Sequence, residues 1–365
     1  MNRRLKYILS IICLFLIGSQ LSFAAGGGHG EEGEDINVKD LILDHIGDAY
    51  EWHILTVGET HVSIPLPVIV FGENSGLNVF SSSKFHHGSS EYNGFYIAQD
   101  GDYKGKIVEK NAAGEEIRPW DFSLTKNAIA LLIASFILVF IVLSVARWYK
   151  KNSTKDNPQV PGGFIGFMEL FIMNVNDDII KPCVGKNYKK FAPYLLTAFF
   201  FIFINNIMGL IPIFPGGANV TGNIAITLVL ALFTLVIVNV FGTKEYYKEI
   251  FWPEVPTWLK VPIPIMPAIE LVGVFTKPFA LMIRLFANIL AGHSIVLGLV
   301  CLIFVTAKLG TAINGSMTVV SVVLTIFIDF VEILVAYIQA YVFTMLSAVF
   351  IGLAQVEPHH HAEKH

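Results

Sequence analysis

Charged residues are scarce in this chain. Only 15% of its 365 residues are Asp, Glu, Lys or Arg, whereas 54% are hydrophobic. Soluble domains carry about 25% charged residues, so the composition excludes an ordinary soluble domain and indicates a polytopic membrane protein. The net charge of -4 gives no basic footprint for binding nucleic acid. We therefore expect membrane lipids, and no nucleic acid, among its partners.

Cysteine is scarcer still, with three residues in the chain. Cys13, Cys183 and Cys301 form no spaced pair, which excludes a disulfide framework and a zinc site of the usual kind. The histidines of the N-terminal third also lack a recognisable ligand spacing, so no metal and no other cofactor is expected. We interpret them as surface residues: His29, His45, His53, His61, His86 and His87.

The N-terminus has the pattern of a signal peptide over residues 1–25. Arg3, Arg4 and Lys6 precede an apolar run over 7–18, and small residues at 22–25 offer a cleavage site. An uncleaved first membrane helix is the alternative, but the run is short for a span. Cleavage would place the mature N-terminus outside the cytoplasm.

Residues 26–120 are polar and predict an extracytoplasmic module. The segment opens with an acidic, Gly-rich tail. Short β-like runs follow at 53–57, 61–64 and 66–71, and a turn-forming stretch follows at 72–76. We expect a small, mostly β module.

The remainder, residues 121–356, predicts an all-α polytopic membrane domain with five spanning helices and one interfacial helix. A basic cluster after the first span (Arg147, Lys150, Lys151 and Lys155) marks the cytoplasmic side. Residues 163–181 mix apolar and acidic side chains and suit a helix at the cytoplasmic interface. The expected spans are 124–146, 191–213, 224–241, 265–307 and 317–355.

The last two spans are longer than the ~20 residues that a perpendicular helix needs. They are therefore expected to be tilted, as an antiparallel hairpin. Counting spans from an external N-terminus places the C-terminus in the cytoplasm. The tail over 357–365 contains three consecutive histidines at 359–361, and we interpret it as a solvated tail.

Arg284 lies inside the apolar stretch 278–300. A charge in hydrocarbon costs a few kcal/mol on insertion scales, and arginine stays protonated in proteins. Roughly as much helix precedes Arg284 as follows it, so its side chain would reach either interface with difficulty. A structural salt bridge to Glu270 or Glu332 is the other interpretation that the sequence leaves open.

Polar residues repeat on the arginine helix. Glu270, Lys277 and Arg284 recur every seven residues, so they lie on nearly one helical face, with a drift of about 20° per step. Asn288 continues this face. His293 follows Arg284 by nine residues and lies about 180° away at 100° per residue.

The last helix supplies a counterpart. If the two long helices run antiparallel with Gln339 level with Arg284, then His293 lies ~13 Å and Glu332 ~10 Å toward the external side. A histidine and a carboxylate thus reach nearly the same depth. Histidine titrates near neutrality and burial raises a carboxyl pKa toward that range, so the pair predicts a proton relay outside the arginine, although such a pair can also be structural.

The segment Arg284-Leu-Phe-Ala-Asn288-Ile-Leu-Ala-Gly292-His293 resembles the signature of subunit a of F-type ATP synthases. The likeness covers roughly residues 120–355. It extends to Glu270 through Pro278, to Asn205 through Pro212, to Asn223 and to Gln339.

This resemblance implies a non-catalytic stator subunit of the proton channel, with the c-ring and the peripheral-stalk b subunits as partners in the cell inner (plasma) membrane. Arg284 would face the carboxylate of the rotating c-ring, with Gln339 as its companion and Asn288 as a polar neighbour. The remaining site residues would line the half-channels: His293 and Glu332 the external one, with Asn223 nearby, and Glu270 the cytoplasmic one.

The acid and the histidine are exchanged relative to some bacterial members, as in mitochondrial relatives. Gly209 stands where some relatives have an acid, so no proton site is carried over to it. A rival hypothesis is a self-contained proton-coupled secondary transporter, but no inverted repeat or pair of matched broken helices is visible in the sequence. A purely structural scaffold would leave Arg284 unexplained.

Overall fold

The computed structural model describes residues 47–57, 60–73, 75–111, 114–152, 160–211, 216–252 and 265–355. The predicted signal peptide, the acidic start of the module and the His-rich tail lie outside these residues. The described chain divides into two compact units. The β-containing unit combines 47–133, 207–220 and 292–332, and the helical unit combines 134–206, 221–291 and 333–355.

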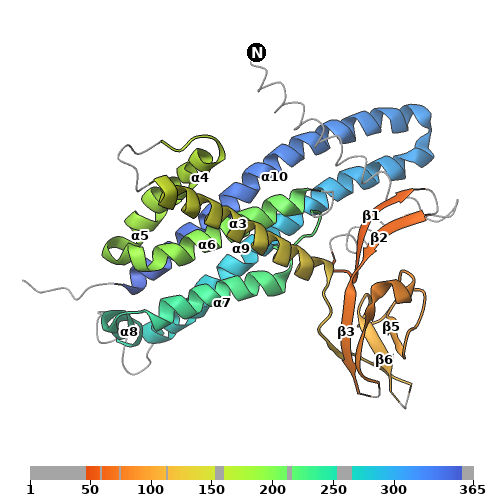
Figure 1. Cartoon of the computed structure of the whole chain (residues 1–365), viewed down its shortest axis with the longest axis horizontal. Helices are drawn as coiled ribbons and strands as arrows, with labels where there is room; N and C mark the ends of the chain where they lie inside the picture. The colour runs from red at the N-terminus through yellow and green to blue at the C-terminus, as the bar shows by residue number, and fades with distance from the viewer. Residues whose placement is uncertain are drawn as a thin grey trace, which may run out of the picture. The chain divides into compact units, whose positions relative to one another are not determined.

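Short strands build the N-terminal part of the β-containing unit (Figure 1). They pair antiparallel into three small sheets, in the orders β1-β2, β4-β3-β8 and β5-β6-β7. The strands are β1 (Glu51–Val57), β2 (Thr60–Pro65), β3 (Pro67–Gly72), β4 (Gly76–Ser81), β5 (Phe95–Ile97), β6 (Ile107–Lys110), β7 (Glu116–Ile117) and β8 (Trp120–Asp121).

The core of the strand region comes from alternating side chains. Val68 and Val70 of β3 point to the same face, because successive strand residues alternate between faces. They pack with Phe85, Phe95 and Ile107, all fully buried. The prediction of a small β region is confirmed, and its three predicted runs coincide with β1, β2 and β3.

Helices make up most of the remaining chain. Four segments are long and apolar enough to cross a membrane, or up to five if the bent pair α7 and α8 forms one span. The helices that contribute to these segments are α3 (Lys126–Asn152), α6 (Tyr188–Leu210), α7 (Ile224–Val240), α8 (Lys244–Phe251), α9 (Ile265–Thr306) and α10 (Thr311–Ala354).

The predicted interfacial segment is helical. It comprises α4 (Gly163–Asn174), a π-helical turn over Val175–Ile180, and α5 (Lys181–Val184). With α6 it forms one of the four candidate spans. Its placement at the membrane surface therefore remains a prediction.

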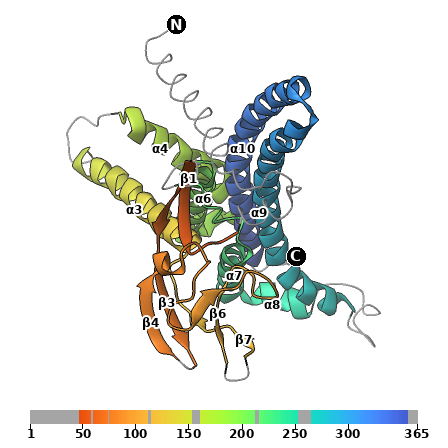
Figure 2. The ribbon, with the colours of Figure 1, turned by 90° about the vertical axis from the view of Figure 1, so that its right-hand side faces the viewer.

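The helices α9 and α10 form the expected long hairpin, and they lie side by side in Figures 1 and 2. A short turn joins them at Gly310, whose φ of 102° favours glycine. Contacts run antiparallel, since His293 meets Glu332 and Asn288 meets Gln339. At 1.5 Å per residue the helices measure about 63 and 66 Å, twice the ~30 Å of a hydrocarbon core.

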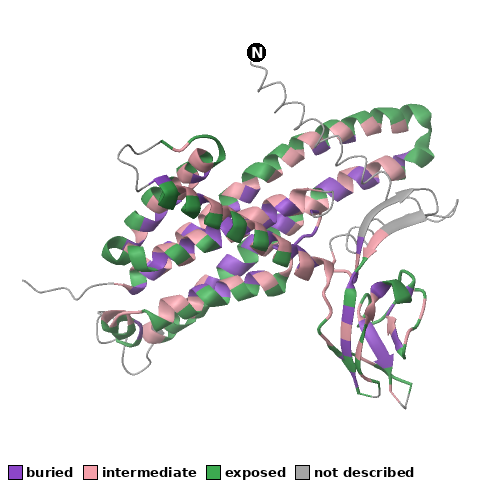
Figure 3. Cartoon of the chain, in the orientation of Figure 1, coloured by how far each residue is buried: buried purple, intermediate pink, exposed green. Residues whose placement is uncertain are grey.

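The helical unit has its own apolar core (Figure 3). Leu195, Phe199 and Ile202 of α6 repeat at i, i+4 and i+7, which places them on one helical face. They pack in one cluster with Leu285 of α9 and Phe343 of α10. This packing fixes which face of α9 is buried, and thereby which face carries the arginine.

Candidate functional site

Arg284 lies on the exposed face of α9. Leu281 and Leu285 on the adjoining face are buried in the core, whereas Ile283, Arg284 and Ala287 are exposed. Within the part of the chain that the structure describes, the guanidinium group makes no ion pair or hydrogen bond. Glu270 and Glu332 are both described, so this chain contains no internal salt bridge from either acid to Arg284.

Asn288 lies one helical turn after Arg284 on α9, and its side chain contacts α10. Its Nδ2 donates a hydrogen bond of 2.7 Å to Oε1 of Gln339. The Gln339 side chain is buried between α9 and its neighbours, with an exposed fraction of only 3%. The bond satisfies a buried carbonyl oxygen that would otherwise cost about 1–3 kcal/mol, so it fixes the register of α9 against α10 beside the arginine.

The β-containing unit brings His293 and Glu332 together. His293 Nδ1 lies 3.5 Å from Glu332 Oε1, and both side chains are largely buried, with exposed fractions of 20% and 11%. Gly292 makes the space for the Glu332 carboxylate, and Gly209 lies close to the histidine ring. A Cβ atom on Gly292 would overlap Glu332 Oε1, and one on Gly209 would lie 3.7 Å from His293 Nε2.

A polar stripe continues along α10 beyond Glu332. Ser321 and Thr325 are fully buried, and Thr325 Oγ1 donates to the Ser321 carbonyl oxygen at 2.8 Å. Asp329 follows with its Oδ2 atom enclosed by protein. Residues four apart lie on one face of a helix. The spacing of Ser321, Thr325 and Asp329 is a signal in the sequence that could have identified this stripe.

A second network, which the sequence did not predict, joins α6 to α10 in the helical unit. Thr221 Oγ1 donates to Asn206 Oδ1 at 2.6 Å, and Asn206 Nδ2 donates to the carbonyl oxygen of Ala336 at 3.3 Å. Asn223 lies nearby in sequence and caps α7, because its Oδ1 accepts a 3.0 Å hydrogen bond from the Ala225 amide. In the structure the Asn223 side chain therefore acts as the N-cap of α7.

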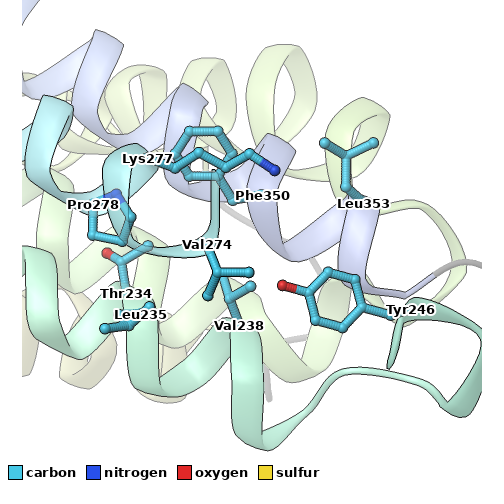
Figure 4. A pocket seen from close by; sticks show the side chains of 9 residues that line it. All are labelled: Thr234, Leu235, Val238, Tyr246, Val274, Lys277, Pro278, Phe350 and Leu353. Atoms are coloured by element: carbon cyan, nitrogen blue, oxygen red, sulfur yellow. The ribbon is translucent and has the colours of Figure 1, made fainter. Parts of the chain in front are cut away.

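Lys277 lies at a small cavity of the helical unit (Figure 4). Its ammonium group lies 5.9 Å from the ring centroid of Phe350. Glu270, two turns earlier on α9, is half-buried. The cavity is mainly apolar, with three polar side chains, and is lined by Thr234, Leu235, Val238, Tyr246, Val274, Lys277, Pro278, Phe350 and Leu353.

These features define a multi-pass membrane protein with two long helices. They carry a paired His/Glu site and an arginine that has no acidic partner among the described residues. Comparison with known proteins assigns the family. The model of the ATP synthase A chain family matches residues 129–352, and a domain of unknown function (DUF8433) matches residues 41–122. The chain belongs to the ATP synthase subunit a family.

Individual relatives agree. ATP synthase subunit a 2 of Chlorobaculum tepidum is 41% identical over 259 residues, which cover 68% of this chain and 67% of the relative. The subunit a of Chlorobium phaeobacteroides strain BS1 is 36% identical over 93% of this chain and 81% of its own. The subunit a of Anaeromyxobacter strain Fw109-5 is 32% identical over 93% of this chain and 76% of the relative.

Membership identifies a non-catalytic subunit of the membrane sector, in a family devoted to proton transport and ATP synthesis. The match covers the helices that hold every predicted site residue. The strand region lies within the second match, to a domain whose function is unknown.

Proposed function

We propose that this chain is the proton-translocating stator subunit of an F-type ATP synthase, in which Arg284 faces the carboxylates of a rotating c-ring. The observation that carries the proposal is the exposed guanidinium in the middle of α9, without an acidic partner among the described residues. A charge at membrane depth is expensive unless it is paired. Its partner is therefore a carboxylate on another subunit.

The external half-channel would pass through the His293 and Glu332 pair. A proton arriving from outside follows the polar stripe of Ser321, Thr325 and Asp329 and reaches the pair, since all of them share the outer part of the hairpin. The 3.5 Å separation of His293 Nδ1 and Glu332 Oε1 suits direct proton transfer after a slight closure. From there the proton neutralises a ring carboxylate.

Neutralisation lets the ring turn. A protonated carboxyl can face lipid at low cost, whereas an ionised one cannot. After nearly a full rotation the site loses its proton into the second half-channel, and Arg284 stabilises the resulting anion by opposite charge. The same fixed charge repels protons and so prevents direct passage between the two half-channels.

The cytoplasmic half-channel would lie near Glu270 and the cavity at Lys277. Glu270 offers a carboxylate that can accept the released proton, and the cavity offers space between α7, α9 and the end of α10. Asn223 belongs to the other side: the resemblance assigns it to the external half-channel, where it would act by capping α7. Gln339 and Asn288 would hold the arginine helix in register.

The proposal includes the assembly and its orientation. The chain would contact the c-ring through the exposed face of α9, and the peripheral-stalk b subunits elsewhere. It would lie in the cell inner membrane, with a signal peptide removed, the β module outside and the C-terminus in the cytoplasm. Helix α4 would lie at the cytoplasmic interface.

Purification from membranes in mild detergent tests this proposal against a self-contained transporter. Co-isolation with a c-ring and an ATPase head, together with ATP-driven proton uptake after reconstitution, supports the stator function. A monodisperse chain that transports a solute by itself contradicts it. A Glu332→Gln complex is the internal control, since it should retain the subunits and lose most of the proton uptake.

A further inference from the structure

The sheet β4-β3-β8 has apolar side chains on both faces. Its inner face, with Val68 and Val70, packs on the core of the strand region. An antiparallel sheet with one solvated face normally alternates apolar and polar side chains. Here the outer face is apolar as well, and no described residue covers it.

The strand register assembles this outer face, which we call the aromatic face. Phe71 pairs with Leu77 on one side and with Trp120 on the other, and Ile69 pairs with Val79. Phe122 extends the row, because its amide donates to the Ile69 carbonyl oxygen at 2.9 Å. The exposed fractions are 50% for Phe71, 66% for Leu77, 65% for Val79, 71% for Trp120 and 65% for Phe122.

Exposed apolar patches of this kind mark sites that bind a protein or a membrane. The position of this one selects the membrane. Trp120 lies six residues before α3, the first candidate span. A chain of six residues reaches at most ~20 Å, so the aromatic face lies close to the point where the chain enters the bilayer, whose headgroup region extends about 5–8 Å beyond the hydrocarbon core on each side.

The connection to α3 is also held to the sheet. The Leu124 amide donates to the Pro67 carbonyl oxygen at 3.1 Å, and the Lys126 amide, at the first residue of α3, donates to the Ala49 carbonyl oxygen at 2.9 Å. Ser123 Oγ accepts from the Ile69 amide at 3.0 Å. The sheet is thus bonded to the connection as far as Leu124, and Ala49, just before β1, is bonded to the first residue of the span.

We propose that the aromatic face docks on the outer surface of the lipid bilayer beside α3. Tryptophan and other aromatic side chains favour the membrane interface, where one part of the ring is apolar and another is wet. The face would seat the strand region on the membrane and hold the entry of α3 at a fixed depth. This role is independent of Arg284 and of proton transfer.

Spin labels on the full complex test the proposal. Leu77→Cys, Val79→Cys and Trp120→Cys are made in a background without other cysteines, and the complex is reconstituted in vesicles of phosphatidylethanolamine and phosphatidylglycerol. Oxygen concentrates in lipid and a soluble nickel chelate stays in water, so their collision rates with the label report its surroundings. Asp102→Cys, on an exposed turn outside the aromatic face, is the matched control.

We expect the ratio of oxygen to nickel accessibility to be severalfold higher at the three face positions than at Asp102. Nickel accessibility as high as at Asp102 would overturn the proposal, because the face would then be in water. Low accessibility to both reagents would also overturn it, because another subunit, a second copy or the N-terminal segment would then cover the face.

A second measurement uses Trp120→Phe, a substitution that keeps an aromatic side chain on the face. Lipids brominated near the headgroup should quench tryptophan fluorescence of the unsubstituted complex more than that of the Trp120→Phe complex. Equal fractional quenching of the two complexes contradicts lipid contact at Trp120.

Discussion

Gly292 leaves no room for a methyl group beside Glu332. A Cβ atom at this position would overlap Oε1 of the carboxylate and lie 3.1 Å from its Cδ and 3.3 Å from its Cγ. Ordinary carbon contacts begin at about 3.5 Å. In a Gly292→Ala variant the carboxylate must therefore move away, and its 3.5 Å contact with His293 cannot persist unchanged.

Gly292→Ala should affect the rate of proton transfer much more than the stability of the fold. Only the end of a flexible side chain opposes the new methyl group, so the cost to folding should stay below the ~1–3 kcal/mol typical of an overpacked core. Proton transfer is more demanding, since a misplacement of about 1 Å can cost on the order of 100-fold in rate. We expect ATP-driven proton uptake to fall at least about tenfold while the complex assembles normally.

The assay is the initial rate of acidification in vesicles that contain the intact complex. Gly298→Ala is the matched control, because a Cβ atom on this other α9 glycine would meet nothing within 4 Å. Combining Gly292→Ala with Glu332→Asp should restore part of the rate, since the shorter side chain draws the carboxylate back. Wild-type acidification by Gly292→Ala, or an equal loss in Gly298→Ala, would refute the reasoning.

Three further predictions concern the helices around the site. Gly352→Ala should reduce the amount of assembled complex sharply, because its Cβ would overlap the backbone carbonyl oxygen of Cys183, which cannot rotate away; normal assembly on a native gel would contradict this. Asp329→Asn should slow proton uptake severalfold with unchanged assembly, and Asp329→Glu should recover part of it; an unaffected rate would remove Asp329 from the external path. Asn288→Leu should lower the thermal midpoint through a loss of about 1–3 kcal/mol, because it leaves the buried Gln339 oxygen unsatisfied. Adding Gln339→Leu should recover much of that loss, and additive losses would show that the hydrogen bond does not couple the two helices.

The sequence predicted the elements whose signal is strong and local. Long apolar runs located α3, α6, α9 and α10, and short β-like runs bounded by turn residues located the first three strands. The antiparallel hairpin of α9 and α10 was also predicted, because two long spans joined by a short connection must run in opposite directions. That geometry predicts nearly the same depth for His293 and Glu332, which lie 3.5 Å apart in the structure.

Other features depend on contacts between distant segments, which a single sequence does not state. Nothing local indicated that Asn206 would meet both Thr221 and Ala336. The role of Gly292 as space for the Glu332 carboxylate likewise depends on packing between two helices. The aromatic face could not be recognised from the sequence, because its residues come from three strands and their facing depends on register.

The central claim is that Arg284 meets a carboxylate outside this chain. The most direct measurement compares ATP-driven proton uptake by intact complexes that carry Arg284→Gln or Ile283→Gln. Both changes put the same side chain on the exposed face of α9, but only the first removes the charge. The account predicts no uptake with Arg284→Gln and substantial uptake with Ile283→Gln. Uptake at the unsubstituted rate by the Arg284→Gln complex would contradict it.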